Sequence, residues 1–111
     1  MSDKVLEASA LLDIYGGLLT EKQREALDMQ LNFDYSLAEI AENQHCTRQA
    51  AQDAIKKGMA RLVELESKLH IDSRVREMEA RLDAIERRTD DAGIAEETAN
   101  IRRIWEDNNG V

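Results

Sequence analysis

The amino-acid sequence predicts an all-α protein, and three observations support this class. Proline is absent and only five glycines occur among the 111 residues, so few positions would interrupt a helix. Residues that favour helix, such as Ala, Leu, Glu and Arg, are abundant. No segment shows the alternation of β-branched and polar residues that marks a strand.

Two helices are expected within the first 35 residues. The first spans about Asp3–Tyr15 and should end at Gly16 and Gly17, because glycine readily adopts the backbone conformation that ends helices. Thr20 and Gln23 have the spacing of a capping box, in which each side chain accepts a hydrogen bond from the other residue's backbone N–H. The second helix is therefore expected to begin after Thr20.

Two further capping signals predict a third and a fourth helix. Ser36 and Glu39 repeat the capping-box spacing and indicate that a short helix follows. Thr47 is expected to cap a longer helix, whose apolar stripe continues to His70. Because only a short turn separates these two helices, they are expected to form a helix-turn-helix unit.

The residue types around this turn fit a helix-turn-helix. Ala41 is small enough for the two helices to cross closely, and Cys46 supplies an apolar residue after the turn. We expect Ala51 to pack against Ile40. His45 occupies the position where φ is usually positive, and histidine tolerates that region better than most residues do.

Charge is distributed unevenly along the chain, whose net charge is -8. Residues 1–35 carry three basic and seven acidic side chains, and residues 77–111 carry five and ten. Residues 36–76 carry seven and six, so only this third is not acidic. A nucleic-acid-binding domain is often much more basic, but the basic residues of this third can form a small positive patch on an acidic body. Its cations are Arg48, Lys56, Lys57 and Arg61.

The start of the fourth helix carries side chains that suit DNA recognition. Arginine pairs with guanine and glutamine with adenine in the major groove, whereas lysine and arginine also contact phosphates. The alternative is that these positions are simply the solvated face of an amphipathic helix. The residues predicted to bind DNA are Thr47, Arg48, Gln49, Gln52, Lys56, Lys57 and Arg61.

Catalysis, metal binding and membrane insertion are not expected. Cys46 and His45 are adjacent, but the spacing of a metal site is missing and the other histidine is far along the chain. The carboxylates are spaced as exposed helix faces, and no glycine-rich phosphate loop occurs, so we expect no enzyme and no cofactor. The single cysteine, the short apolar stretches and an N-terminus unlike a signal peptide favour a cytoplasmic protein.

The last 41 residues predict a helical extension of the helix-turn-helix domain, with the division at about residue 70. A bend or a new helix is expected near Asp72 or Ser73. After a turn at residues 89–93, a last helix should carry Trp105 as a packing anchor and end within residues 106–110. A heptad seam runs along the first part of this extension: Ile71, Val75, Met78, Leu82 and Ile85.

Two arrangements could cover the seam. A second copy of the chain could bury both seams in a C2 dimer and thereby present two helix-turn-helix units. Alternatively, the last helix folds back onto the preceding one within the monomer. We expect dimerisation, because the apolar stripes of the C-terminal extension are too long for the N-terminal core to cover alone.

The segment Leu18–Leu62 resembles the YlxM family of small bacterial proteins. The resemblance rests on "LTEKQRE" at the start of the second helix, "YSLAEIAE" in the third and "TRQAAQDAIKK" in the fourth. Cys46 and Ala51 stand where the family more often has valine. The resemblance implies a fold similar to region four of sigma factors. It also implies a DNA-binding or regulatory protein whose gene commonly lies beside genes of the signal recognition particle pathway.

Two function classes therefore remain open. In the first, the protein is a sequence-specific DNA-binding regulator that uses the fourth helix. In the second, it is an adaptor that contacts the protein or RNA of the signal recognition particle through acidic or apolar faces. The motif favours DNA, whereas the acidity favours the adaptor.

Overall fold

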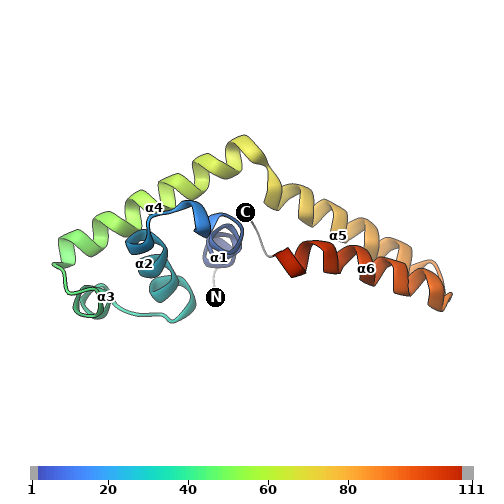
Figure 1. The fold of residues 1–111 in the computed structure, drawn as a ribbon, viewed down its shortest axis with the longest axis horizontal. Helices are drawn as coiled ribbons and strands as arrows, with labels where there is room; N and C mark the ends of the chain where they lie inside the picture. Colours follow the sequence, from blue (N-terminus) through green and yellow to red (C-terminus); the bar gives the residue numbers. More distant parts are fainter. Residues whose placement is uncertain (1–2, 109–111) are drawn as a thin grey trace.

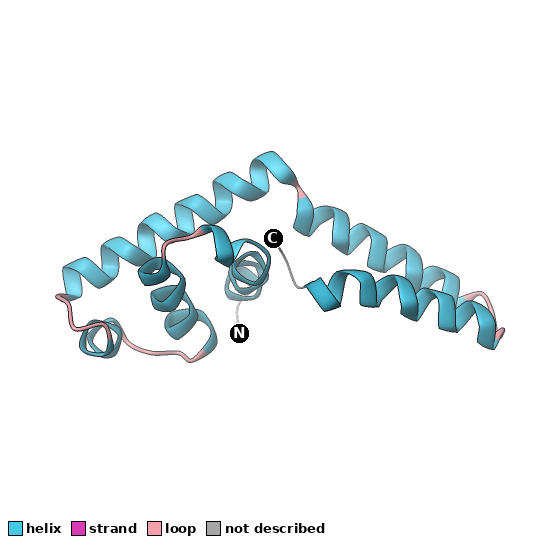
Figure 2. Cartoon of the chain, viewed as in Figure 1, coloured by secondary structure: helices cyan, strands magenta, loops and turns pink. Residues whose placement is uncertain are grey.

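The computed structural model describes residues 3–108, and this part of the chain is helical without strands (Figure 2). The predicted all-α class is therefore confirmed. The elements are α1 (Asp3–Tyr15), the short 3-10 helix η1 (Gly16–Leu18), α2 (Glu21–Asn32), α3 (Leu37–Asn43), α4 (Arg48–Leu69), α5 (Ile71–Arg87) and α6 (Ala92–Asn108). No helix within residues 3–108 combines the length and the hydropathy that crossing a membrane requires.

Helix α4 is the central element of the N-terminal body, and α1, α2 and α3 all pack against it (Figure 1). One apolar cluster lies where α1 and α2 meet the middle of α4, and a second lies where α2 and α3 meet its beginning. The first contains Leu12, Ile14, Tyr15, Leu27, Leu62 and Leu65. The second contains Ala26, Ile40, Ala41 and Ala51.

The predicted capping residues define the helix starts in the body. The Thr20 hydroxyl accepts a hydrogen bond from the Gln23 backbone N–H, and the Gln23 side chain accepts one from the Thr20 backbone N–H. Ser36 and Glu39 form the same reciprocal pair. Because each box satisfies two N–H groups that have no partner within the helix, it stabilises that helix start.

The junction between α4 and α5 lies at His70, two or three residues before the expected bend. His70 has a φ of 55° and ends α4, and α5 begins at the next residue. The first N–H groups of α5 are bonded by side chains from elsewhere. The Tyr15 hydroxyl accepts from the backbone N–H of Ile71 at 3.2 Å. The Glu66 carboxylate accepts from those of Asp72 and Ser73 at 3.0 and 3.3 Å.

Helices α5 and α6 form an antiparallel hairpin that projects from the body (Figure 1). Arg102 of α6 pairs with Asp83 at 2.6 Å and with Glu86 at 2.7 Å, both on α5. Leu82 and Thr98 are 4% and 3% exposed within this single chain. The last helix thus folds back onto the preceding one, and it extends to Asn108, so the end expected within residues 106–110 lies partly outside the described residues.

Candidate nucleic-acid interface

The turn between α3 and α4 is a complete Schellman motif. The backbone N–H of His45 donates to the Glu42 carbonyl at 3.2 Å, and that of Cys46 donates to the Ala41 carbonyl at 3.0 Å. His45 has a φ of 55°, as expected from its position. The motif satisfies carbonyls at the end of α3 and reverses the chain, which fixes the direction in which α4 begins.

Packing inside the unit holds α3 and α4 together. Ala51 is fully buried and belongs to the same cluster as Ile40 and Ala41. Cys46 packs against this cluster as a partly buried residue. The Gln44 side-chain amide also donates to the Lys22 carbonyl at 3.0 Å, which connects the turn to α2. The start of α4 is therefore positioned by packing as well as by the turn.

Four of the predicted DNA-binding residues share one solvent-facing side of α4. Arg48, Gln49, Gln52 and Lys56 are all exposed. At about 100° per residue, the last three lie about 40° to about 100° around the helix axis from Arg48. The Thr47 hydroxyl caps α4 by accepting from the Ala50 N–H at 3.0 Å, and its own hydrogen remains able to donate. These residues form one continuous polar face at the start of the helix.

Lys57 and Arg61 lie on a different flank of α4. They are about 180° and about 220° around the axis from Arg48, where they line a shallow hollow with residues that include Leu18 and Thr20. Lys57 pairs with Asp53 at 3.1 Å, and Arg61 pairs with Glu64 at 3.1 Å. Their charges are thus partly offset within α4 itself.

Arg48 and Lys56 are the two predicted cations for which no ion pair occurs within residues 3–108. From the sequence, Arg48, Lys56, Lys57 and Arg61 were expected to form a single positive patch. The structure divides them into a pair that faces solvent beside the glutamines and a pair that is engaged with carboxylates on another flank. The angle between these two pairs around the axis of α4 follows from helical spacing. The ion pairs could not be predicted in this way, because they depend on side-chain positions.

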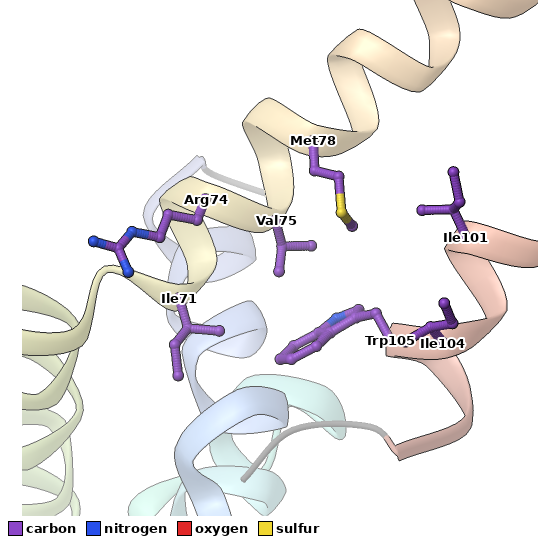
Figure 3. Close-up of a pocket in the computed structure, with 7 residues that line it drawn as sticks. All are labelled: Ile71, Arg74, Val75, Met78, Ile101, Ile104 and Trp105. Carbon is purple, nitrogen blue, oxygen red and sulfur yellow. The ribbon is translucent and has the colours of Figure 1, made fainter. Parts of the chain in front are cut away.

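The predicted seam residues lie in three different environments. Leu82 is buried inside the hairpin, and Ile85 is 44% exposed. The other three, Ile71, Val75 and Met78, line an apolar groove of about 490 Å³ at the base of the hairpin. Figure 3 shows this groove between α5 and α6, with Trp105 across from these side chains. Its remaining lining residues are Arg74, Ile101, Ile104 and Trp105.

A hydrogen-bond network that was not predicted from the sequence lies at the α4–α5 junction. The Tyr15 hydroxyl donates to the Glu66 carboxylate at 2.6 Å across 51 residues of sequence. Burial and this hydrogen bond raise the pKa of Tyr15 to about 12. Burial alone would raise the pKa of Glu66, but hydrogen bonds from Tyr15, Asp72 and Ser73 outweigh it and lower that pKa. No periodicity or local motif indicates such a distant pair.

Known proteins resemble this chain over most of its length. Residues 2–101 match the UPF0122 family, described as "Putative helix-turn-helix protein, YlxM / p13 like". A UPF0122 protein of Thermoanaerobacter sp. (strain X514) is 36% identical over 107 residues, which cover 96% of this chain and 92% of that protein.

Higher identity occurs over a shorter segment. A UPF0122 protein of Acetivibrio thermocellus is 57% identical over 67 residues, or 60% of this chain and 57% of that protein. One from Clostridium kluyveri is 54% identical over 66 residues, which cover 60% of each. In these two comparisons the chain spans about three fifths of the relative's length.

Proposed function

Because the chain belongs to the UPF0122 family of YlxM/p13-like helix-turn-helix proteins, we propose that it is a regulator that binds duplex DNA with the start of α4. One observation carries this proposal. The Schellman turn directs α4 so that Arg48, Gln49 and Gln52 are exposed together within its first two turns. Recognition helices of this class contact base edges with residues of their N-terminal part.

Each side chain of this face has a chemical role in the proposal. Arg48 donates two hydrogen bonds to a guanine, and Gln49 or Gln52 pairs with an adenine. Thr47 and Lys56 contact phosphates on either side and fix the position of the helix in the groove. Lys57 and Arg61 contribute less, because a phosphate would have to compete with Asp53 and Glu64 for them.

The acidic body limits the strength of this binding. The net charge of -8 repels DNA at long range, and the proposed face adds only two cations that are not ion-paired within the described residues. Each cation that contacts a phosphate adds about -0.9 to the slope of log affinity against log salt. A shallow slope is therefore expected, with base contacts contributing most of the specificity.

Fluorescence anisotropy tests the proposal with duplexes selected from a randomised pool, titrated at about 50 mM and about 200 mM salt. We expect specific binding that weakens modestly as salt rises. The control is Ala80→Arg, which adds a positive charge to an exposed position on α5, far from α4 along the chain. Equal binding of selected and unselected duplexes at both salt concentrations would contradict sequence recognition.

A second candidate function has its own support. The ion pairs of Lys57 and Arg61, together with the net charge of -8, leave few cations for phosphates, which favours a partner other than duplex DNA. Because the chain resembles YlxM proteins, the partner in this second candidate function is the protein or RNA of the signal recognition particle. The same titration separates the two candidates, because failure to bind any duplex even at low salt would leave the adaptor.

A further inference from the structure

The α5–α6 hairpin exposes apolar side chains along one face. Ile71, Val75 and Met78 line the groove at its base together with Ile101, which is 39% exposed. Towards the tip, Ile85 and Ile94 are 44% and 42% exposed. Helical spacing places Ile85 on the same side of α5 as Met78, and Ile94 on the same side of α6 as Ile101. Groove and tip therefore belong to one continuous face.

Within residues 3–108, no other element covers that face. The described residues extend 57 × 26 × 23 Å, and the hairpin projects along the longest axis (Figure 1). Only its base contacts the body, where Ile71 and Trp105 pack against the cluster that contains Tyr15 and Leu65. As far as the described residues extend, the apolar face is therefore accessible to another molecule.

The size and composition of the face fit a second copy of this chain, and we propose that it is the interface of a homodimer. Each helix of the hairpin has 17 residues. Two such helices side by side, each about 25 Å long and about 10 Å wide, present about 500 Å² per copy. Two copies then bury about 1,000 Å², which reaches the lower limit for a specific interface.

The face has the anatomy of a protein–protein interface. Charged residues of both signs flank the apolar side chains: Arg74 and Arg81 lie along α5, and Glu97 lies along α6. An apolar centre with a charged rim is typical of such surfaces. In a two-fold symmetric dimer the same surface of each copy contacts the other copy, so no second complementary surface is required.

The hairpin is also rigid enough to present this face before association. Arg102 joins α6 to Asp83 and Glu86 of α5, and the Thr98 hydroxyl donates to Glu86 at 3.0 Å. The hydrogen bond from the Arg102 guanidinium lowers the pKa of the Glu86 carboxyl. Because Leu82 is already buried between the two helices, changing it would disturb the monomer. A test must use an exposed position instead.

Sedimentation velocity of the full chain over a range from about 1 µM to about 100 µM tests this interface. The expected mass at the upper end is twice the monomer's 12.6 kDa. Ile101→Arg should raise the dissociation constant about tenfold or more, because it places a charge in the apolar centre. Ala80→Arg adds the same charge to an exposed position on the opposite side of α5 and should leave the constant unchanged.

Each contrary result overturns the proposal. A mass of 12.6 kDa at about 100 µM excludes the dimer. A wild-type dimer that Ile101→Arg and Ala80→Arg affect equally uses another surface, and a mass that grows beyond two copies contradicts a closed two-fold pair. Circular dichroism confirms that both variants remain helical. None of these outcomes bears on DNA binding, which is measured separately.

Discussion

At the scale of single residues, side-chain position distinguishes cations that the sequence presents as equivalent. Arg48 and Lys56 face solvent beside Gln49 and Gln52, whereas Lys57 forms an ion pair with Asp53. An exposed pair of this kind adds little stability, but it lowers the charge that Lys57 can offer to a phosphate. The proposed site therefore makes different predictions for neighbouring residues.

Three alanine substitutions separate the roles of these residues. Arg48→Ala should weaken binding to the selected duplex by about 1 to 3 kcal/mol and relax its specificity. Lys56→Ala should weaken binding to all duplexes alike and reduce the salt slope by about 0.9. Lys57→Ala, one residue further along α4, is the matched control and should weaken DNA binding less than Lys56→Ala does. Anisotropy titrations measure all three, and an unchanged affinity of the Arg48 variant would exclude its proposed base contact.

The Tyr15–Glu66 pair predicts a pH dependence of stability. The pKa of Tyr15 rises from 10.0 to about 12 in the folded chain. A raised pKa means that the protonated hydroxyl stabilises the fold fully below pH about 10, and that this contribution is lost as the pH rises towards 12. The lowered pKa of Glu66 has the opposite consequence, because its contribution is lost in acid, below its ordinary value of 4.5.

Tyr15→Phe tests this pair by urea unfolding at pH 7, 9 and 11. The variant should lose about 1 to 3 kcal/mol at pH 7, since the Ile71 N–H and the Glu66 carboxylate each lose a partner. Its stability should then fall less than that of the wild type at alkaline pH. Tyr35→Phe removes a hydroxyl from a partly exposed ring and controls for general alkaline effects. Parallel curves for wild type and Tyr15→Phe would show that the hydroxyl is not the responsible group.

At the scale of helices, the approach of α2 to α4 depends on Gly58. This residue is buried within α4, and a Cβ added there would lie 2.8 Å from Leu27 Cδ1 and 3.2 Å from Gln23 Cβ. Leu27 is itself fully buried, so it has little room to move. The glycine thus permits a contact between helices, although it lowers the intrinsic helix propensity of α4.

Gly58→Ala should therefore destabilise the chain, which reverses the usual effect of this change in a helix. Intrinsic helix propensity favours alanine over glycine by about 1 kcal/mol, whereas overpacking a core lowers the free energy of unfolding by about 1 to 3 kcal/mol. We expect a net loss of about 1 kcal/mol in urea unfolding. Ala60→Gly, at an exposed position of the same helix, should lose about 1 kcal/mol by propensity alone. A more stable Gly58→Ala variant would contradict the close helix contact.

Local chemistry explains which elements the sequence predicted. Three helix starts could be located from sequence spacing because their caps are local. The side chains of Thr20, Ser36 and Thr47 each accept a hydrogen bond from the backbone N–H three residues later. The expected end of the fourth helix at His70 and new helix near Asp72 or Ser73 lie close to the observed junction, but spacing alone could not identify Tyr15 and Glu66, which support the start of α5 across space. The same limit applies to the pairing of Arg102 with Asp83, which joins two helices rather than successive turns of one.

At the scale of the whole molecule, the chain is elongated. The Cα radius of gyration is 17.3 Å, whereas a compact domain of this length would have about 13 Å. The difference reflects the α5–α6 hairpin, which projects away from the helix-turn-helix (Figure 1) and carries the apolar face. The proposed DNA-binding face and the proposed dimer face are therefore on separate parts of the molecule, and each can be altered without the other.

NMR mapping of the DNA contact would show whether the start of α4 binds the duplex. Amide signals of the full chain would be followed while the selected duplex is added. We expect the largest shifts at the start of α4, at Arg48, Gln49, Gln52 and Lys56, with smaller ones near Lys57. Signals of α5 and α6 should stay in place. The largest shifts on the hairpin or the acidic body, or no shifts at all with a duplex in excess, would contradict recognition of DNA by α4.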